Sequence, residues 1–292
     1  MPKKLWGGRF SVPADKRFER FSSSLPQDWK LGLYDLRASE AHCRMLARTG
    51  ILRPQAARKI LKGLQAVRLE FGRSAHVFAG TAYEDIHSWI ESRLLKHAGP
   101  DAERIHAGRS RNDQVNQACR MYIKDHAGRV LADLTLVGRA LLKQAKQHRL
   151  TAIAGMTHLQ KAQPVLLAHV FLSYIEALSR SAERISDAAR RADVLTLGSG
   201  ALAGSSLPLD RAWVQKNLGF SRVSANSLDA VGSRDFIAEW VCTLALLASD
   251  FSRIAEDLLW GHLEETGVYV LPESLCTGSS MMPQKKNADF LE

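Results

Sequence analysis

The stretch IKDHAGRVLADLTLVGRAL, residues 123–141, decides the fold of this chain, because its apolar residues recur with alternating steps of four and three. The recurring positions are Ile123, Ala127, Val130, Leu134, Val137 and Leu141. Two further segments repeat this spacing, at Phe171, Ile175, Leu178, Ala182, Ile185, Ala189 and Ala192 and at Ile237, Trp240, Leu244, Leu247, Phe251, Ile254 and Leu258. Such seams predict long helices that pack nearly parallel in a left-handed sense.

The length of these helices predicts an all-α, long-helix bundle. The first helix is expected from about residue 113 to 148, which at 1.5 Å per residue is roughly 50 Å, and no strand pattern interrupts the three segments. Residues 1–110 have shorter helical patterns, such as 54–71, separated by Gly and Pro. We therefore predict a smaller, mostly helical N-terminal domain over 1–110 and a central bundle domain over 111–292. The Gly/Ser-rich stretch 197–211 is expected to be a loop between the second and third helices.

The composition favours a globular protein that attracts anions. The chain has 292 residues, 46% of them hydrophobic, and a formal net charge of +10. Its partners could be nucleic acid, acidic membranes or carboxylate metabolites. No nucleic-acid-binding motif and no apolar run of signal-peptide or membrane-spanning length is found, so we expect a cytoplasmic protein without nucleic-acid or membrane partners. The four cysteines are far apart and do not have the spacing of zinc ligands.

The motif HAGRSRNDQ, residues 106–114, immediately precedes the first long helix. Ser110 or Asn112 can cap that helix, and its free N–H groups, with Arg109 and Arg111, could form a pocket for a carboxylate or phosphate. The alternative is a capped helix with solvated arginines. Taken alone, the motif favours this alternative, because capping sequences are common.

The motif GMTHLQKAQP, residues 155–164, contains a histidine between hydrogen-bonding residues. Pro164 fits the first turn of the second long helix, which would place His158 in the loop just ahead, flanked by Thr157 and Gln160. A histidine in that position can act as a general acid or base near neutral pH. The alternative is a surface or packing histidine.

The motif GSSMMPQKKN, residues 278–287, predicts a flexible loop that can close over an anion, followed by a helix start near Lys285, Lys286 and Asn287. Ser279 could act as a nucleophile or, if activated, as a base. The alternative is a mobile linker rich in Ser and Lys. The chain has no GxSxG elbow, which argues against a hydrolase triad.

The separation of the first two motifs predicts an oligomer. One motif opens the first long helix and the other follows its far end, so within one chain they lie roughly 50 Å apart. If both motifs are functional, the site must be assembled from different subunits.

Taken together, the motifs resemble the argininosuccinate lyase family of the fumarase and aspartase superfamily, to which the delta crystallins are related. They are KLWGGRF at 4–10, EDIH at 84–87, RSRNDQV at 109–115, THLQKAQP at 157–164, LGSGALAG at 197–204 and GSSMMPQKKN at 278–287. The resemblance implies a homotetramer around a central helical bundle, with each site shared between three subunits. It implies reversible β-elimination of argininosuccinate to fumarate and arginine without a metal or organic cofactor.

The resemblance also implies roles for individual residues. Ser279 matches the catalytic serine that abstracts a proton, and His158 matches the histidine that transfers a proton on the leaving side. The implied substrate-binding residues are Ser24, Asn112, Thr157, Lys285 and Asn287, with Ser110, Arg111 and His87 as supporting candidates. The substrate loses a proton to give a doubly charged aci-carboxylate, which the site must stabilise before the C–N bond breaks.

Several positions depart from the family pattern. Ser22, Met156, Lys161 and Ala288 stand where the family usually has Asn, Tyr, Arg and Pro. Family chains also continue well past residue 292, so the resemblance covers their N-terminal portion only. For the isolated chain we expect weak or absent catalysis and poor solubility.

Three alternatives remain open from the sequence. The chain could be a catalytically inactive, truncated or crystallin-like structural homologue, or it could be another lyase of the fumarase superfamily. The third alternative, a basic helical protein that binds nucleic acid, is motivated only by the net charge of +10.

Overall fold

The structure, a computed structural model, describes residues 11–12, 15–74 and 83–292. The motif KLWGGRF at 4–10 lies outside the described residues. The chain divides into two compact units, of which the first comprises Met1–Asp125 with Arg191–Phe236 and the second His126–Arg190 with Ile237–Glu292. Residues 111–125 and 191–236 thus belong with the N-terminal residues, and the predicted domain boundary at residue 110 stays a prediction.

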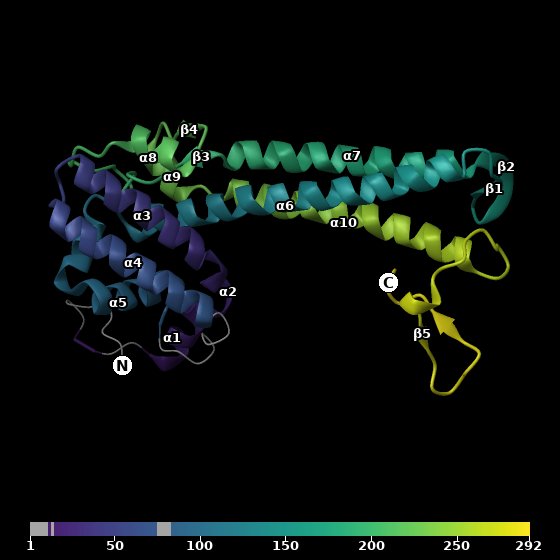
Figure 1. The fold of residues 1–292 in the computed structure, drawn as a ribbon, viewed down its shortest axis with the longest axis horizontal. Helices are drawn as coiled ribbons and strands as arrows, with labels where there is room; N and C mark the ends of the chain where they lie inside the picture. Colours follow the sequence, from purple (N-terminus) through teal and green to yellow (C-terminus); the bar gives the residue numbers. More distant parts are fainter. Residues whose placement is uncertain (1–10, 13–14, 75–82) are drawn as a thin grey trace. The chain divides into compact units, whose positions relative to one another are not determined.

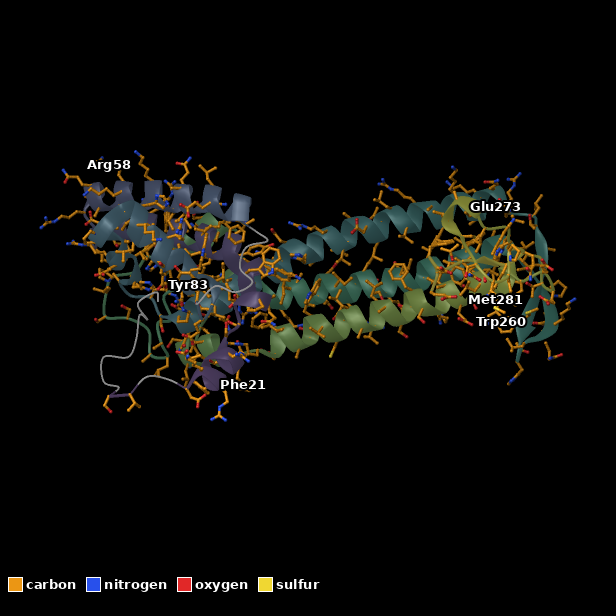
Figure 2. The ribbon with its side chains drawn as sticks, turned by 90° about the horizontal axis from the view of Figure 1, so that it is seen from below. Phe21, Arg58, Tyr83, Trp260, Glu273 and Met281 are labelled. Carbon is orange, nitrogen blue, oxygen red and sulfur yellow. The ribbon has the colours of Figure 1, made fainter. Side chains whose placement is uncertain are left out.

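The first unit consists mainly of helices. Its elements are α1 (Lys16–Ser22), α2 (Leu25–Asp28), η1 (Trp29–Leu31), α3 (Gly32–Arg48), α4 (Pro54–Ser74), α5 (Ile86–Ala98), η2 (Gly99–His106), the start of α6 (Arg111–Gln147), β3 (Val194–Leu195), α8 (Arg211–Leu218), β4 (Arg222–Val223) and α9 (Ser227–Gly232). Helices α3, α4 and α5 pack around one apolar core (Figure 1). Leu36, Leu46, Ile60 and Leu64 are fully buried in this core, whereas Arg58 of α4 points outward (Figure 2).

The first turns of α6 bind the returning segment 191–236 through polar side chains. The Asn116 amide donates to the carbonyl of Ser233 at 3.0 Å, and Gln117 Oε1 accepts the N–H of Thr196 at 2.8 Å. Arg120 is buried, and its guanidinium carbon lies 4.0 Å from the centre of the Phe236 ring. Hydrogen bonds and a cation–π contact thus join Asn116, Gln117 and Arg120 to the returning segment.

The second unit contains the three predicted long helices. They are the remainder of α6, α7 (Leu167–Ala192) and α10 (Asp235–His262), which lie alongside one another in both views (Figures 1 and 2). The predicted seams are confirmed, because every seam position is buried or half-buried except Phe251, which is exposed. Between α7 and α10, the Tyr174 hydroxyl donates to Asp257 Oδ2 at 3.1 Å, and the Ser181 hydroxyl donates to Asp250 Oδ2 at 2.8 Å.

The described residues are predominantly helical as predicted, and they include three short two-stranded sheets that the sequence did not predict. The sheets pair β1 (Ala152–Thr157) with β2 (Gln160–Leu166), β3 with β4, and β5 (Thr277–Gly278) with β6 (Lys286–Asn287); η3 (Glu273–Leu275) precedes the last pair. The prediction for Pro164 was wrong: it lies in β2 opposite Ala154, and α7 begins at Leu167. Both strands of a two-stranded sheet are edge strands, where a residue without an N–H is tolerated.

None of the helices in the described ranges is long and apolar enough to cross a membrane.

Candidate active site

Ser24 is held against the EDIH segment by the carboxylate of Asp28. The Ser24 hydroxyl donates to Asp28 Oδ2 at 2.6 Å, and the N–H of Ile86 donates to Asp28 Oδ1 at 3.1 Å. The Ser24 N–H also donates to the carbonyl of Glu84 at 2.9 Å. Burial raises the pKa of Asp28, while the Ser24 and Ile86 hydrogen bonds oppose the rise. Because the Ser24 proton is directed at Asp28, the outward lone pairs of its oxygen can accept hydrogen bonds from a ligand.

His87 lies beneath the surface beside the carboxylate of Asp35 of α3. His87 Nδ1 is 3.1 Å from Asp35 Oδ2, and the two side chains are 1% and 0% exposed. The Gln114 amide donates to Asp35 Oδ1 at 2.7 Å. Burial alone would raise the pKa of Asp35, but His87, Arg109 and Gln114 hold it well below its ordinary value. His87 is therefore enclosed by protein groups, so it can support the site from within and is not exposed to a ligand.

Ser110 caps α6, as predicted. Its hydroxyl accepts the N–H of Asn112 at 3.4 Å, and Asp113 Oδ1 accepts the N–H of Ser110 at 2.9 Å. This reciprocal arrangement is a capping box, with Asp113 in the third helical position. Asn112 is exposed in the first turn, and its amide donates to the carbonyl of Ala201 at 2.9 Å.

The two arginines of this motif are buried or half-buried and make polar contacts within the first unit, and the predicted anion pocket stays a prediction. Arg109 is 9% exposed, and its Nη1 donates to Ser39 Oγ at 2.7 Å. Arg111 makes ion pairs with Asp85 at 3.2 Å and with Glu91 at 2.9 Å. Acidic and hydroxyl groups of the first unit thus take up these guanidinium groups. A direct role of Arg111 in substrate binding stays a prediction.

Thr157 and His158 lie at the tip of the β1–β2 hairpin. Thr157 is paired with Gln160, so His158 and Leu159 form a two-residue turn. Both turn residues have positive φ, 51° and 58°, as a type I′ turn requires. Neither is glycine or asparagine, so the turn carries a backbone cost of about 1–3 kcal/mol per residue. His158 is exposed at this strained tip and not in a loop that leads directly into a helix.

Ser279 begins a tight turn in the second unit. Its Oγ accepts the N–H of Met282 at 3.1 Å, and the N–H of Lys285 donates to the carbonyl of Met282 at 3.0 Å. Ser279 is half-buried, whereas Lys285 is exposed. Figure 2 shows Met281 of this loop and Glu273 at the same end of the long helices as Trp260. A backbone N–H directed at Ser279 Oγ is a group that can stabilise negative charge on that oxygen.

The two ends of the Ser279 loop are joined by β5 and β6. Thr277 pairs with Asn287, and Gly278 pairs with Lys286. Lys286 forms an ion pair with Glu273, and the Thr277 hydroxyl donates to Asp289. The predicted helix start at Lys285–Asn287 was wrong, because Lys286 and Asn287 pair across the small sheet and the N–H of Lys285 donates to Met282 within the turn. Residues 277–287 therefore form a closed loop with a paired neck.

The predicted site residues divide between the two units. The first unit holds Ser24, His87, Ser110, Arg111 and Asn112, and the second unit holds Thr157, His158, Ser279, Lys285 and Asn287. Within the first unit, His87 belongs to the EDIH segment. Ser24 and Arg111 contact the same segment, at Glu84 and Asp85. In the described chain no hydrogen bond or ion pair joins Thr157 or His158 to Ser279, Lys285 or Asn287.

Three acidic residues that the sequence motifs did not identify as functional hold the predicted residues in place. They are Asp28, which binds Ser24, Asp35, which binds His87, and Asp113, which binds Ser110. Asp113 lies within a motif that had been singled out, and Asp28 follows Ser24 at the spacing of one helical turn. Asp35 lies far from His87 in sequence, and no local pattern signals that pair.

Comparison with known proteins identifies the family of this chain. The lyase family matches residues 8–292. The chain belongs to this family. The lyase chain is 45% identical over 289 residues to an argininosuccinate lyase of Hydrogenobaculum sp. and 44% identical over 290 residues to one of Sulfurihydrogenibium sp.. Each alignment covers 99% of this chain, and the chain spans 63% of the length of each relative.

A solved structure of an EDDS lyase variant with bound fumarate has the same fold. Its TM-score with the lyase chain is 0.82 at 31% sequence identity, with 89% of this chain and 51% of that chain covered. The predicted fold, a helical bundle of the fumarase and aspartase type, is thus confirmed.

Proposed function

We propose that this lyase chain carries residues of an active site for the reversible β-elimination of argininosuccinate to fumarate and arginine. The observation that carries the proposal is the hairpin tip, where His158 is presented to solvent in a left-handed backbone conformation. A conformation that costs free energy at an exposed position is typical of a functional residue. The similarity to argininosuccinate lyases at 44–45% identity supports this substrate over those of other lyases.

Ser279 is the base that removes a proton from the carbon next to a substrate carboxylate. The transferred proton leaves two negative charges on the carboxylate side of the intermediate. A serine hydroxyl is a weak base unless its alkoxide is stabilised, and the Met282 N–H lies 3.1 Å from Ser279 Oγ. Lys285 adds positive charge from the same loop. Its neighbour Lys286 is engaged by Glu273, so Lys285 is the lysine of this pair assigned to the intermediate.

His158 supplies the proton for the leaving guanidino nitrogen as the C–N bond breaks. Fumarate and arginine are then released, and the same steps run in reverse for addition. Thr157 beside His158, Asn287 at the loop neck, and Asn112 and Ser24 of the first unit bind the polar groups of the substrate. Ser24 accepts from substrate N–H groups because its own proton is directed at Asp28.

The site is shared between three copies of the chain in a homotetramer. Asn112 lies in the first turn of α6 and His158 follows its last turn, and a helix of 37 residues extends about 55 Å. The long helices also keep apolar side chains exposed, among them Leu136 at 62%, Val241 at 58% and Leu246 at 51%. A second copy packed on these helices would cover such residues and supply the missing half of each site.

The test is fumarate release from argininosuccinate, followed by ultraviolet absorbance. It uses this chain and a longer chimera in which residues 1–292 replace the matching part of the Hydrogenobaculum relative. The chimera is expected to form fumarate, and Ser279→Ala or His158→Gln is expected to lower kcat at least about 100-fold. A tetrameric chimera, verified by light scattering, that forms no fumarate from argininosuccinate would refute the proposal. Release of fumarate from EDDS alone would point to a different lyase.

A further inference from the structure

Asp113 collects backbone hydrogen bonds from two separate segments of the first unit. Its side chain is 0% exposed. Oδ1 accepts the N–H of Ser110 at 2.9 Å, and Oδ2 accepts the N–H groups of Gly198 at 3.0 Å and Gly200 at 2.9 Å. Burial raises the pKa of Asp113, and these donors with Arg109 oppose the rise. Three donors on one buried carboxylate exceed what a helix cap needs.

The two glycines belong to residues 197–204, here called the glycine loop. Gly198 and Gly200 have φ of 87° and 63°, in the region that favours glycine. A Cβ at Gly200 would lie 2.6 Å from the carbonyl oxygen of Gly204, whose N–H in turn donates to the carbonyl of Ser199 at 2.9 Å. The glycine loop is thus tightly folded, and two of its N–H groups, those of Gly198 and Gly200, converge on Asp113.

The same loop returns to the residue that precedes Asp113. The carbonyl of Ala201 accepts one N–H of the Asn112 amide at 2.9 Å. This bond fixes which way the Asn112 carboxamide is turned. The amide keeps one N–H to donate to an anionic oxygen and keeps Oδ1 to accept a ligand N–H.

We propose that Asp113 is a positioning residue of the substrate site, holding the glycine loop so that the Ala201 carbonyl orients the Asn112 carboxamide toward the substrate. The proposal rests on the proposed function for the role of Asn112 and adds a residue that does not touch the substrate. Asp113→Asn keeps the volume but removes the negative charge and one of the two accepting oxygens, so the bonds that hold the glycine loop are weakened. Asn112 then turns freely and loses part of its binding energy.

The experiment is a double-mutant cycle in the chimera described above. Asn112→Ala and Asp113→Asn are each expected to raise KM about tenfold with kcat changed less than about threefold. The double variant is expected to show the same KM as either single variant, because both remove one oriented contact. The proposal would be overturned if KM in the double variant rose by the product of the two single-variant increases. An unchanged KM in a folded Asp113→Asn protein would also overturn it.

Two further variants separate positioning from stability. Gln117→Leu removes hydrogen bonds to Thr196 and Leu197, just outside the Asp113 contacts, and is the matched control: it is expected to lower stability and leave KM within about twofold. Gly200→Ala displaces the loop while Asp113 is intact, and is expected to raise KM as Asp113→Asn does. If Asp113→Asn does not fold, the KM of Gly200→Ala tests the positioning role in its place. A KM rise in Gln117→Leu, or none in Gly200→Ala, contradicts the proposal.

A second readout does not depend on activity. In this chain, the side-chain amide signals of Asn112, assigned by their loss in Asn112→Ala, are expected to shift in Asp113→Asn and to stay in Gln117→Leu. Unchanged Asn112 signals in Asp113→Asn would refute the positioning role even in a protein that forms no fumarate. Absence of fumarate from the tetrameric chimera, with the expected signal shift in this chain, would instead refute the proposed function alone.

Discussion

Acidification is expected to unfold this protein partly through one buried histidine, His42 of α3. Its side chain is 1% exposed, and its Nε2 lies 2.9 Å from the carbonyl of Ala107, to which the ring N–H donates. Burial, with the charges of Arg109 and His106, lowers the pKa of His42 from its ordinary 6.5 to about 3, although the Ala107 bond opposes the change. The folded protein therefore keeps His42 neutral at mildly acidic pH.

The sign and size of the effect follow from proton uptake. Between pH 6.5 and 3 the unfolded chain binds a proton on His42 that the folded chain does not bind, so stability falls as pH falls. Each pH unit in this range lowers the free energy of unfolding by about 1.4 kcal/mol. From pH 7 to pH 5 the His42 contribution is a loss of roughly 2 kcal/mol.

The assay is urea unfolding followed by circular dichroism at pH 7, 6 and 5, for the natural chain and for His42→Gln. Glutamine can donate to the Ala107 carbonyl but does not titrate. Between pH 7 and 5 the free energy of unfolding of the variant is therefore expected to fall by roughly 2 kcal/mol less than that of the natural chain. His148→Gln, at a half-buried position, controls for the removal of a histidine. Equal pH slopes for the natural chain and His42→Gln, within about 0.5 kcal/mol, would refute the reasoning.

Three further outcomes are expected from single substitutions. Leu159→Gly relieves a positive φ of 58° and is expected to raise the free energy of unfolding by about 1 kcal/mol, measured by urea titration; a loss of stability would contradict the strained turn. Asp35→Asn removes the charge of a buried carboxylate beside His87 and is expected to cost about 3–5 kcal/mol, whereas Asp101→Asn, in a half-buried pair with the exposed Lys59, is expected to cost less than about 1 kcal/mol; similar losses would be inconsistent with the burial argument. Lys285→Ala in the chimera is expected to lower kcat at least about 100-fold, and Lys286→Ala less than about tenfold; the reverse order would exchange the roles of the two lysines.

The long helices could be predicted because their apolar spacing is local. The seam through Ile123, Ala127 and Leu134 is buried, and α6 begins and ends within two residues of its expected bounds. Periodicity over many turns leaves few alternatives to a helix. The same reasoning offered Ser110 or Asn112 as the cap, and Ser110 is the residue that caps α6, because capping depends on residues two or three positions apart.

The hairpin could not be predicted in the same way. The strand partners of β1 and β2 are set by a turn whose residues, His158 and Leu159, are poor formers of that turn. Pro164 is equally compatible with a helix start and an edge strand. We predicted a helix start at Pro164, whereas in the structure Pro164 lies in strand β2.

The partners of the buried acidic residues and of the arginines are set by contacts between distant segments. Asp35 meets His87, and Arg109 meets Ser39, across separations that no local pattern encodes. The predicted site residues themselves came from their motifs, and their roles stay predictions. What the structure adds is the set of neighbours that orient them.

The buried charges of the first unit have a consequence for how the protein meets solutes at a distance. In the described part of the chain, the buried Asp and Arg side chains are Asp35, Asp113, Arg109 and Arg120, whose formal charges sum to zero. Burial of these side chains therefore leaves the formal net charge of +10 unchanged. The field that reaches into solution stays positive and is screened within about 8 Å at physiological ionic strength. A dianionic solute thus approaches a protein that attracts it before any contact forms, and added salt should slow that encounter.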